Sequence, residues 1–166
     1  MEDGSYVLAR LPYRSTLPRR LAVASEVATL NFVRAQGIPA PTVLGYSIGD
    51  NAVGSEYILM EKLPGTPLGA SWYSLTETER LTILYQIIDM EAKLFAANLP
   101  ANESIYFAFD LPTGVPKVDI PDSVDGLCVG PYAAFSWWFG ERHNLDIDRG
   151  PREYYAASTL STVLIL

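Results

Sequence analysis

A proline-rich stop after a helical repeat constrains the fold of this chain more than any other feature. Residues 21–36 predict a helix, because apolar side chains recur on one face at Val23, Val27, Leu30 and Val33. Gly37 ends this helix, and the two prolines of IPAP (38–41) prevent its continuation, because proline lacks the backbone donor and clashes with the preceding turn. The chain therefore has to turn here, and the residues after position 41 form a separate element.

Three short apolar runs around this helix predict strands. SYVLARL (5–11) precedes the helix, and TVLGYSIG (42–49) and SEYILMEK (55–62) come after it. The five residues DNAVG (50–54) are short enough to join the last two runs as a hairpin. The order strand, helix, strand, strand predicts a small antiparallel sheet that carries one helix, so we expect an α+β fold.

A Pro/Gly connector, LPGTPLG (63–69), separates this part from a region that we expect to be mainly helical. Residues 74–98 predict a long helix, in which Ser74 and Glu77 match the spacing of a capping box. Its apolar stripe consists of Leu81, Leu84, Ile88 and Phe95, broadened by Ile87 and Leu94.

The rest of the chain has weaker patterns. Two short apolar runs, 104–109 and 126–130, predict strands, and residues 152–166 predict the start of another helix. The aromatic-rich segment 132–151 has no clear period, so we expect it to be irregular. Its FSWWFGE sequence favours packing at a junction, because aromatic side chains bury a large area.

The composition excludes several classes of protein. Apolar residues make up 49% of the 166 residues, which indicates a globular core rather than disorder. The net charge of −7 makes nucleic acid an unexpected partner. The single cysteine, Cys128, cannot form a disulfide framework, so we expect an intracellular location. No run reaches the roughly 18 apolar residues of a membrane span, so we expect no transmembrane segment.

Arg10 and Glu26 are charged residues in apolar surroundings. Arg10 lies in the first predicted strand, and Glu26 lies near the start of the first predicted helix. A charge in such a place is costly unless it is paired, so we expect the two residues to be partners. A nucleotide kinase needs this pair, because a strand cation holds the α- and β-phosphates and a helix carboxylate fixes the cation. The spacing by itself favours a plain structural ion pair.

The blocks around this pair resemble a known family. VLARLPY, ASEVATLNFVRAQGIPAPTVLGY and VGSEYILMEKLPGTPL occur in the order found in the N-terminal lobe of aminoglycoside phosphotransferases and choline kinase-like proteins. The sequence is most similar to the fungal branch that includes the altered-inheritance-of-mitochondria proteins. GPYAAFSWWFGERHNLDIDRGP resembles a segment that this branch carries early in its C-terminal lobe.

The resemblance implies a protein-kinase-like fold. Residues 1–63 would be a partial N-terminal lobe that ends in the hinge. Residues 64–166 would be the first helical part of a C-terminal lobe, truncated before the catalytic loop. ATP and Mg²⁺ are the cofactors that the resemblance implies.

The resemblance also assigns site residues. Arg10 matches the position of the lysine that holds phosphate, and Glu26 matches the helix glutamate that pairs with it. Glu61, Lys62 and Leu63 match the hinge, whose main chain meets adenine. An arginine in place of the lysine keeps the charge but has a larger, forked head group, so the phosphate geometry would differ.

The sequence does not supply the rest of the family's catalytic apparatus. Phosphoryl transfer needs an Asp that accepts the hydroxyl proton, and an Asn and a second Asp that bind metal. The only histidine is His143, and no Asn comes after Asp146, so we assign no catalytic and no metal-binding residue. We expect Asp146 and Asp148 to be turn residues, paired with Arg142 or Arg149.

Three functions remain open. The first is a small-molecule phosphotransferase that uses ATP on an unidentified acceptor, inactive as this fragment. The second is a non-catalytic kinase-like protein that binds partners as a scaffold. The third is an incomplete gene product. The expected location is the cytoplasm, or the mitochondrion as the resemblance implies.

Overall fold

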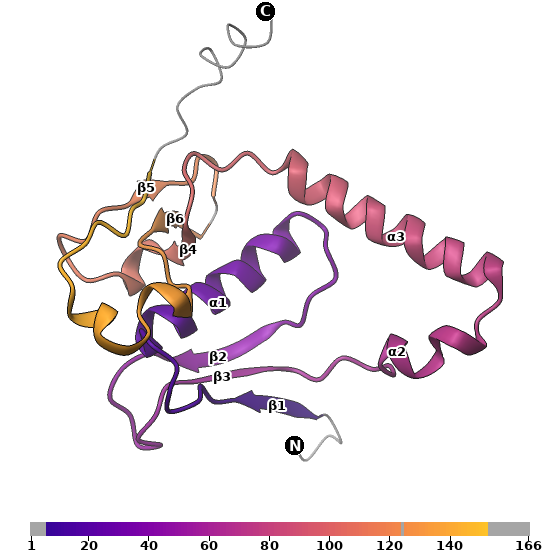
Figure 1. Ribbon diagram of the computed structural model, residues 1–166, viewed down its shortest axis with the longest axis horizontal. Helices are drawn as coiled ribbons and strands as arrows, with labels where there is room; N and C mark the ends of the chain where they lie inside the picture. Colours follow the sequence, from indigo (N-terminus) through magenta and orange to yellow (C-terminus); the bar gives the residue numbers. More distant parts are fainter. Residues whose placement is uncertain (1–5, 124, 153–166) are drawn as a thin grey trace, which may run out of the picture.

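The computed structural model describes residues 6–123 and 125–152, which form a mixed α+β fold as predicted (Figure 1). The first elements have the predicted order: β1 (Val7–Arg10), α1 (Arg19–Ala35), β2 (Val43–Ser47) and β3 (Tyr57–Glu61). The helix predicted for residues 152–166 lies outside the described residues, apart from residue 152. No helix in the described part of the chain is both long and apolar enough to cross a membrane.

The first sheet has the strand order β1–β3–β2 and is antiparallel throughout. Ile58 of β3 lies directly opposite Arg10 of β1 and Tyr46 of β2, so these three residues form one row across the sheet. Residues that are directly opposite in a sheet share a face. The row therefore points its three side chains to one side of the sheet, which is the side that α1 covers.

A specific turn ends α1 where the sequence predicts it. The amide of Gly37 donates to the carbonyl of Arg34, and the amide of Ile38 donates to the carbonyl of Val33. This pair of bonds is the Schellman motif, which satisfies the last carbonyls of a helix. Gly37 has φ +73°, a value that glycine adopts without steric cost. The prolines of IPAP then direct the chain into β2.

The region after the connector is less helical than we predicted. Helices occur at α2 (Leu68–Ser71), η1 (Trp72–Ser74) and α3 (Glu77–Ala96), but a second antiparallel sheet comes after them. It has the order β4–β6–β5, and its strands are β4 (Ser104–Phe107), β5 (Val118–Asp119) and β6 (Leu127–Gly130). The strands predicted at 104–109 and 126–130 are thus confirmed. These short apolar runs pair with each other as strands, and the sheet that they form packs through β4 on a second face of α1.

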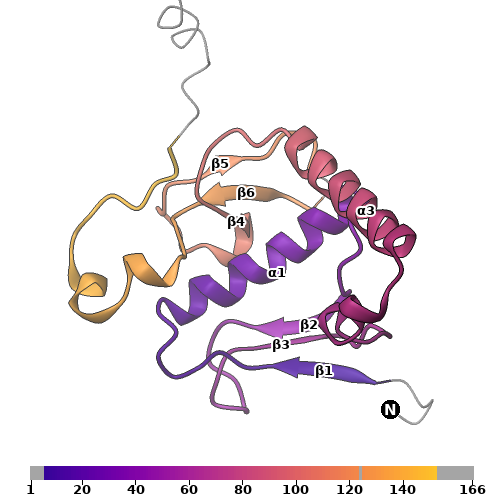
Figure 2. The same cartoon turned by 45° about the vertical axis from the view of Figure 1, so that its right-hand side comes forward.

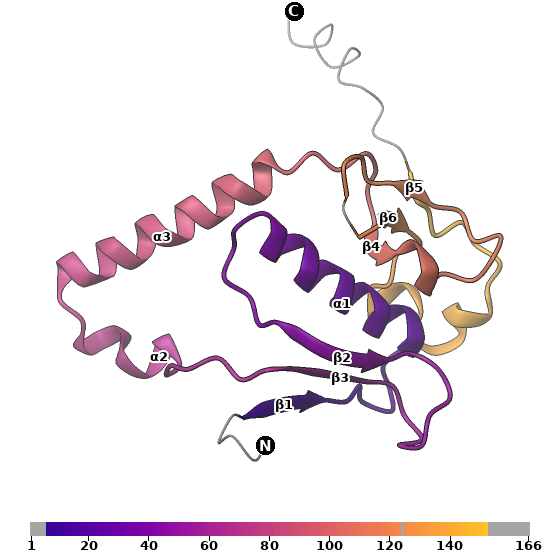
Figure 3. The ribbon, with the colours of Figure 1, turned by 180° about the vertical axis from the view of Figure 1, so that it is seen from behind.

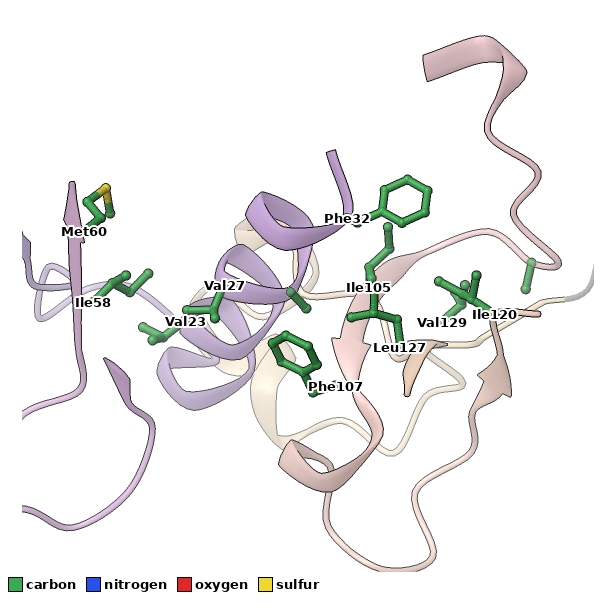
Figure 4. Close-up of a cluster of buried hydrophobic side chains, with 12 residues drawn as sticks. Val23, Val27, Phe32, Ile58, Met60, Ile105, Phe107, Ile120, Leu127 and Val129 are labelled. Carbon is green, nitrogen blue, oxygen red and sulfur yellow. The ribbon is translucent and has the colours of Figure 1, made fainter. Parts of the chain in front are cut away.

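The helix α1 lies between the two sheets, as the turned view in Figure 2 shows. Figure 4 shows Val23 facing Ile58 of the first sheet and Phe32 beside Ile105 of the second. One buried cluster contains residues of both sheets and of α1: Val23, Val27, Ala28, Phe32, Ile58, Met60, Ala101, Ile105, Phe107, Ile120, Leu127 and Val129. The two sheets and α1 therefore share one hydrophobic core.

The long helix α3 stands apart from this core (Figure 3). None of its residues is buried. Its capping box is formed by Thr76 and Glu79, not by Ser74 and Glu77 as predicted. Both pairs have the required spacing, but Ser74 belongs to η1 and its hydroxyl donates to the carbonyl of Ser71 instead.

The aromatic segment forms a loop closed by the amide of Tyr132, which donates to the carbonyl of Arg149. It contains two short turns, η3 (Phe135–Trp137) and η4 (Gly140–Asn144), and is otherwise irregular as predicted. The guanidinium of Arg149 stacks 3.9 Å from the ring centre of Trp138. Phe135 and Phe139 of FSWWFGE are both exposed, and the packing of this segment at a junction between lobes stays a prediction.

Candidate functional site

Arg10 and Glu26 form an ion pair, as the sequence predicts. Arg10 is the last residue of β1 and shares its row with Ile58, beneath α1. Glu26 lies in the second turn of α1, one residue before the buried Val27. The Arg10 side chain remains 57% exposed, whereas that of Glu26 is 28% exposed. The carboxylate is thus partly enclosed and holds a guanidinium whose outer side faces solvent.

A small cavity of about 110 Å³ adjoins this pair. The hydroxyl-bearing residues Tyr13 and Thr16 line it together with Arg10 and Glu26, and the rest of its wall is Leu11, Pro12, Ala22, Val23 and Ile58. The cavity is too small for a whole nucleotide. It can accept water or a small polar group beside the guanidinium, because a water needs only about 10–15 Å³ of such space.

Glu61, Lys62 and Leu63 lie at the opposite end of the same sheet. Glu61 ends β3 and pairs with Val7, whereas Arg10 pairs with Ile58. Three residues of strand, or about 10 Å, therefore separate the row of Arg10 from that of Glu61. The structure brings Arg10 and Glu26 into contact and places the three hinge residues at a distance along the strand.

The Glu61 side chain is fixed by Thr42, a residue that the sequence analysis did not identify. The hydroxyl of Thr42 donates to Glu61 Oε2 at 2.9 Å, and the amide of Thr42 donates to the same oxygen at 3.3 Å. The hydroxyl bond is the main reason why the pKa of Glu61 is lowered from its ordinary value. A Thr directly after Pro41 is the sequence signal that could have suggested this contact.

The chain leaves the central strand β3 after Glu61 and enters the hinge. Among the described residues, the amide of Leu63 makes no backbone hydrogen bond. The side chains of Leu63 and of Leu8 are exposed, and the ammonium group of Lys62 lies 4.9 Å from the ring centre of Tyr6. This end of the first sheet thus carries exposed apolar surface beside the hinge.

Tyr46 and Asp110 form a second polar contact that sequence reasoning missed. The Tyr46 hydroxyl donates to Asp110 Oδ2 at 2.8 Å, although the residues are 64 positions apart. Asp110 ends η2 (Ala108–Asp110) and is only 7% exposed. Burial raises the pKa of the Asp110 carboxyl, and the hydrogen bond from Tyr46 and the charge of Arg20 act against this increase.

The Asp110→Asn variant is expected to lose a pH dependence of stability. The folded-state pKa of Asp110 is raised, so the carboxyl stabilises the fold most below its unfolded pKa of about 3.9. This contribution is lost as pH rises through the folded pKa. The free energy of unfolding of the wild type, minus that of Asp110→Asn, should therefore fall with rising pH in urea titrations. Asp122→Asn, at an exposed position, is the control, and a difference that rises with pH would contradict the assignment.

The predicted turn role of Asp148 is confirmed, with a different arginine partner. Its carboxylate accepts the amide of Gly150 at 2.8 Å and an N–H of Arg152 at 3.3 Å, rather than pairing with Arg142 or Arg149. Over residues 6–123 and 125–152, no three His, Cys, Asp or Glu side chains come together as metal ligands would.

A match to a known protein family covers the part of the chain that contains the ion pair and the hinge. The sequence model of the phosphotransferase enzyme family matches residues 2–118, which include both partners of the ion pair and the hinge. The chain belongs to this family. The phosphotransferase enzyme family is kinase-like, and its members generally depend on ATP and Mg²⁺.

Relatives of the chain are fungal. The subtelomeric hrmA-associated cluster protein of Aspergillus fumigatus is 41% identical over 98% of this chain, which covers 32% of that relative. The mitochondrial protein named altered inheritance of mitochondria protein 9 is 34% identical in Candida tropicalis, over 73% of this chain and 21% of the relative. Its Yarrowia lipolytica counterpart is 27% identical over 92% of this chain and 30% of the relative. The chain thus spans a third or less of these relatives. No solved structure matches.

Proposed function

We propose that these residues form the nucleotide-holding part of a kinase-like small-molecule phosphotransferase. The ion pair between Arg10 and Glu26 carries this proposal, because it joins a strand cation to a helix carboxylate beside an exposed sheet edge. ATP with Mg²⁺ is the proposed ligand, because members of the family generally depend on it, and it would supply the phosphoryl group. The acceptor remains unassigned.

Arg10 holds the α- and β-phosphates in this proposal. A guanidinium has five N–H donors and remains charged at all physiological pH values. Glu26 occupies donors on one side, and the exposed side keeps donors that match the oxygens of a phosphate. Glu26 gives the guanidinium a fixed position, so less conformational freedom is lost when phosphate binds.

The segment Glu61–Leu63 meets the adenine through its main chain. The separation of about 10 Å along the sheet leaves room for the ribose between base and phosphates. Leu8 and Leu63 supply exposed apolar surface for the base, and Leu8 shares the Arg10 side of the sheet because it lies two residues away. Thr42 keeps the Glu61 side chain in place, so the hinge backbone has a defined path.

Phosphoryl transfer is not assigned to these 166 residues alone. The chemistry needs a proton-accepting Asp and metal-binding groups, and the candidates Asp146 and Asp148 lie in the exposed aromatic loop. We therefore propose nucleotide binding without transfer for residues 1–166, and transfer for a protein that contains the catalytic groups. The names of the yeast relatives make the mitochondrion the first location to test.

A non-catalytic scaffold is the second candidate, favoured by the apolar surface of α3. Leu81, Leu84, Tyr85 and Ile88 are all exposed on this helix. Large exposed apolar patches are typical of sites where other proteins bind. A scaffold does not need an exposed arginine that a helix carboxylate holds in place, which is why we place this function second.

Titration calorimetry with Mg·ATP tests the proposed function. We expect saturable binding to one site, and a rise in the melting temperature with ligand concentration, because a ligand of the folded state stabilises it. Mg·GTP is the control for base recognition and should bind more weakly. An absence of both heat and thermal shift would refute the nucleotide proposal and favour the scaffold.

A further inference from the structure

The helix that carries Glu26 is buried on two sides. Val23 and Val27 pack toward the first sheet, whereas Ala24 packs in a second buried cluster with Tyr106 and Cys128 of the second sheet. Ala24 and Ala28 are both fully buried, which lets β4 lie close against the helix. Because adjacent residues are about 100° apart around a helix, these contacts oppose rotation of α1 about its axis.

One row of the first sheet makes a polar side-chain contact at each of its two ends. The row runs from Arg10 through the buried Ile58 to Tyr46. Arg10 binds Glu26 of the helix itself, whereas Tyr46 binds Asp110 of the second part of the core. The outer strands β1 and β2 are thus each tied by a side chain to the elements that lie above the sheet.

The Tyr46–Asp110 bond is stronger than a surface contact. Asp110 is buried, and a bond from a hydroxyl to a carboxylate is charge-assisted. Removing the hydroxyl would leave a buried carboxylate short of a donor, which is costly. In the part of the chain that the structure describes, this is the only side-chain hydrogen bond that joins the first sheet to residues 101–152.

We propose that β4, β6 and the Tyr46–Asp110 bond act as a clamp that holds α1 over the first sheet and so keeps Glu26 in contact with Arg10. Tyr46 and Asp110 are then positioning residues for the nucleotide site, although neither touches the nucleotide. The expected effect on Mg·ATP binding rests on the proposed function, whereas the expected effect on the position of α1 does not.

Hydrogen–deuterium exchange of the free protein tests the clamp without nucleotide. In Tyr46→Phe, which removes only the hydroxyl, amides of residues 22–30 should exchange about threefold faster or more, while those of β3 stay unchanged. Tyr73→Phe, at a position that is 91% exposed, is the matched control. Equal exchange in residues 22–30 of both variants would overturn the clamp, and so would a uniform increase across the chain, because that indicates a merely structural role.

Asp110 provides an independent variant. Asp110→Asn keeps an oxygen that can accept the Tyr46 hydroxyl, whereas Asp110→Ala keeps none. Exchange in α1 should therefore increase less in Asp110→Asn than in Asp110→Ala. The reverse order would overturn the role of this bond.

A double-mutant cycle connects the clamp to the nucleotide. Tyr46→Phe should weaken Mg·ATP binding severalfold in the wild type, and have little further effect once Glu26→Gln has removed the charged partner of Arg10. Additive effects of the two changes would overturn the positioning role. A wild type that binds no Mg·ATP refutes the proposed function, and the exchange data still decide the clamp.

Discussion

Replacing Arg10 with alanine is expected to weaken Mg·ATP binding about 10- to 100-fold. Hydrogen bonds to charged groups contribute about 1.5–3 kcal/mol, and each 1.4 kcal/mol is about a factor of ten in affinity. The variant should keep its fold, because the Arg10 side chain is more than half exposed and such surface pairs stabilise proteins by only about 0–1 kcal/mol. Titration calorimetry measures the affinity, and circular dichroism checks the fold.

Two further variants make this result specific. Arg10→Lys should recover part of the affinity, since it keeps the charge but not the fork of donors. Arg14→Ala removes an exposed arginine four residues away. It should leave the affinity for Mg·ATP within about twofold, because the variant loses a solvent-screened charge but no proposed phosphate contact. Equal losses in Arg10→Ala and Arg14→Ala would indicate a general charge effect rather than a phosphate contact.

Replacing Phe107 with alanine is expected to lower the free energy of unfolding by about 3–5 kcal/mol. Phe107 is 8% exposed and belongs to the cluster that joins both sheets to α1. We expect the protein to unfold in one transition, because the two sheets share that core. The variant should move this whole transition to lower urea concentration. Urea denaturation, monitored both by fluorescence and by circular dichroism, measures it.

The neighbouring Phe109 offers a matched control. Its ring stacks on that of Phe107 with 5.2 Å between ring centres, yet it is 73% exposed. Phe109→Ala should therefore cost about 1 kcal/mol or less. Two separate transitions in Phe107→Ala, or similar losses in the two variants, would contradict a shared core.

The local elements of the first sheet could be predicted because their signals are local. The apolar stripe of α1, the stop at Gly37 and the two strands after it each depend on residues within a few positions. The pairing of Arg10 with Glu26 was also predicted, but the expected burial of Arg10 was wrong, because all four residues of β1 are exposed.

The capping box of α3 shows where a local rule fails. Ser74 with Glu77 and Thr76 with Glu79 have the same spacing, so sequence pattern cannot choose between them. The backbone makes the choice, because Thr76 is extended with ψ 162° whereas Ser74 lies within a 3₁₀ turn.

The second sheet and its link to Tyr46 depend on long-range contacts. The short strands β4 and β6 were predicted, but their place over α1 was not. Ala24 and Ala28 were the available signal, because small residues at helical spacing allow another element to approach closely. The Tyr46–Asp110 bond joins residues 64 positions apart and leaves no periodic trace in the sequence.

NMR can observe the guanidinium of Arg10 itself while Mg·ATP is added. In an NMR titration with Mg·ATP, the Nε–H resonance of Arg10, assigned by its loss in Arg10→Lys, should shift and saturate with the calorimetric affinity, and the resonance of Arg14 should stay in place. If Mg·ATP binds and the Arg10 resonance does not move, other residues hold the phosphates and Arg10 has no part in the nucleotide site.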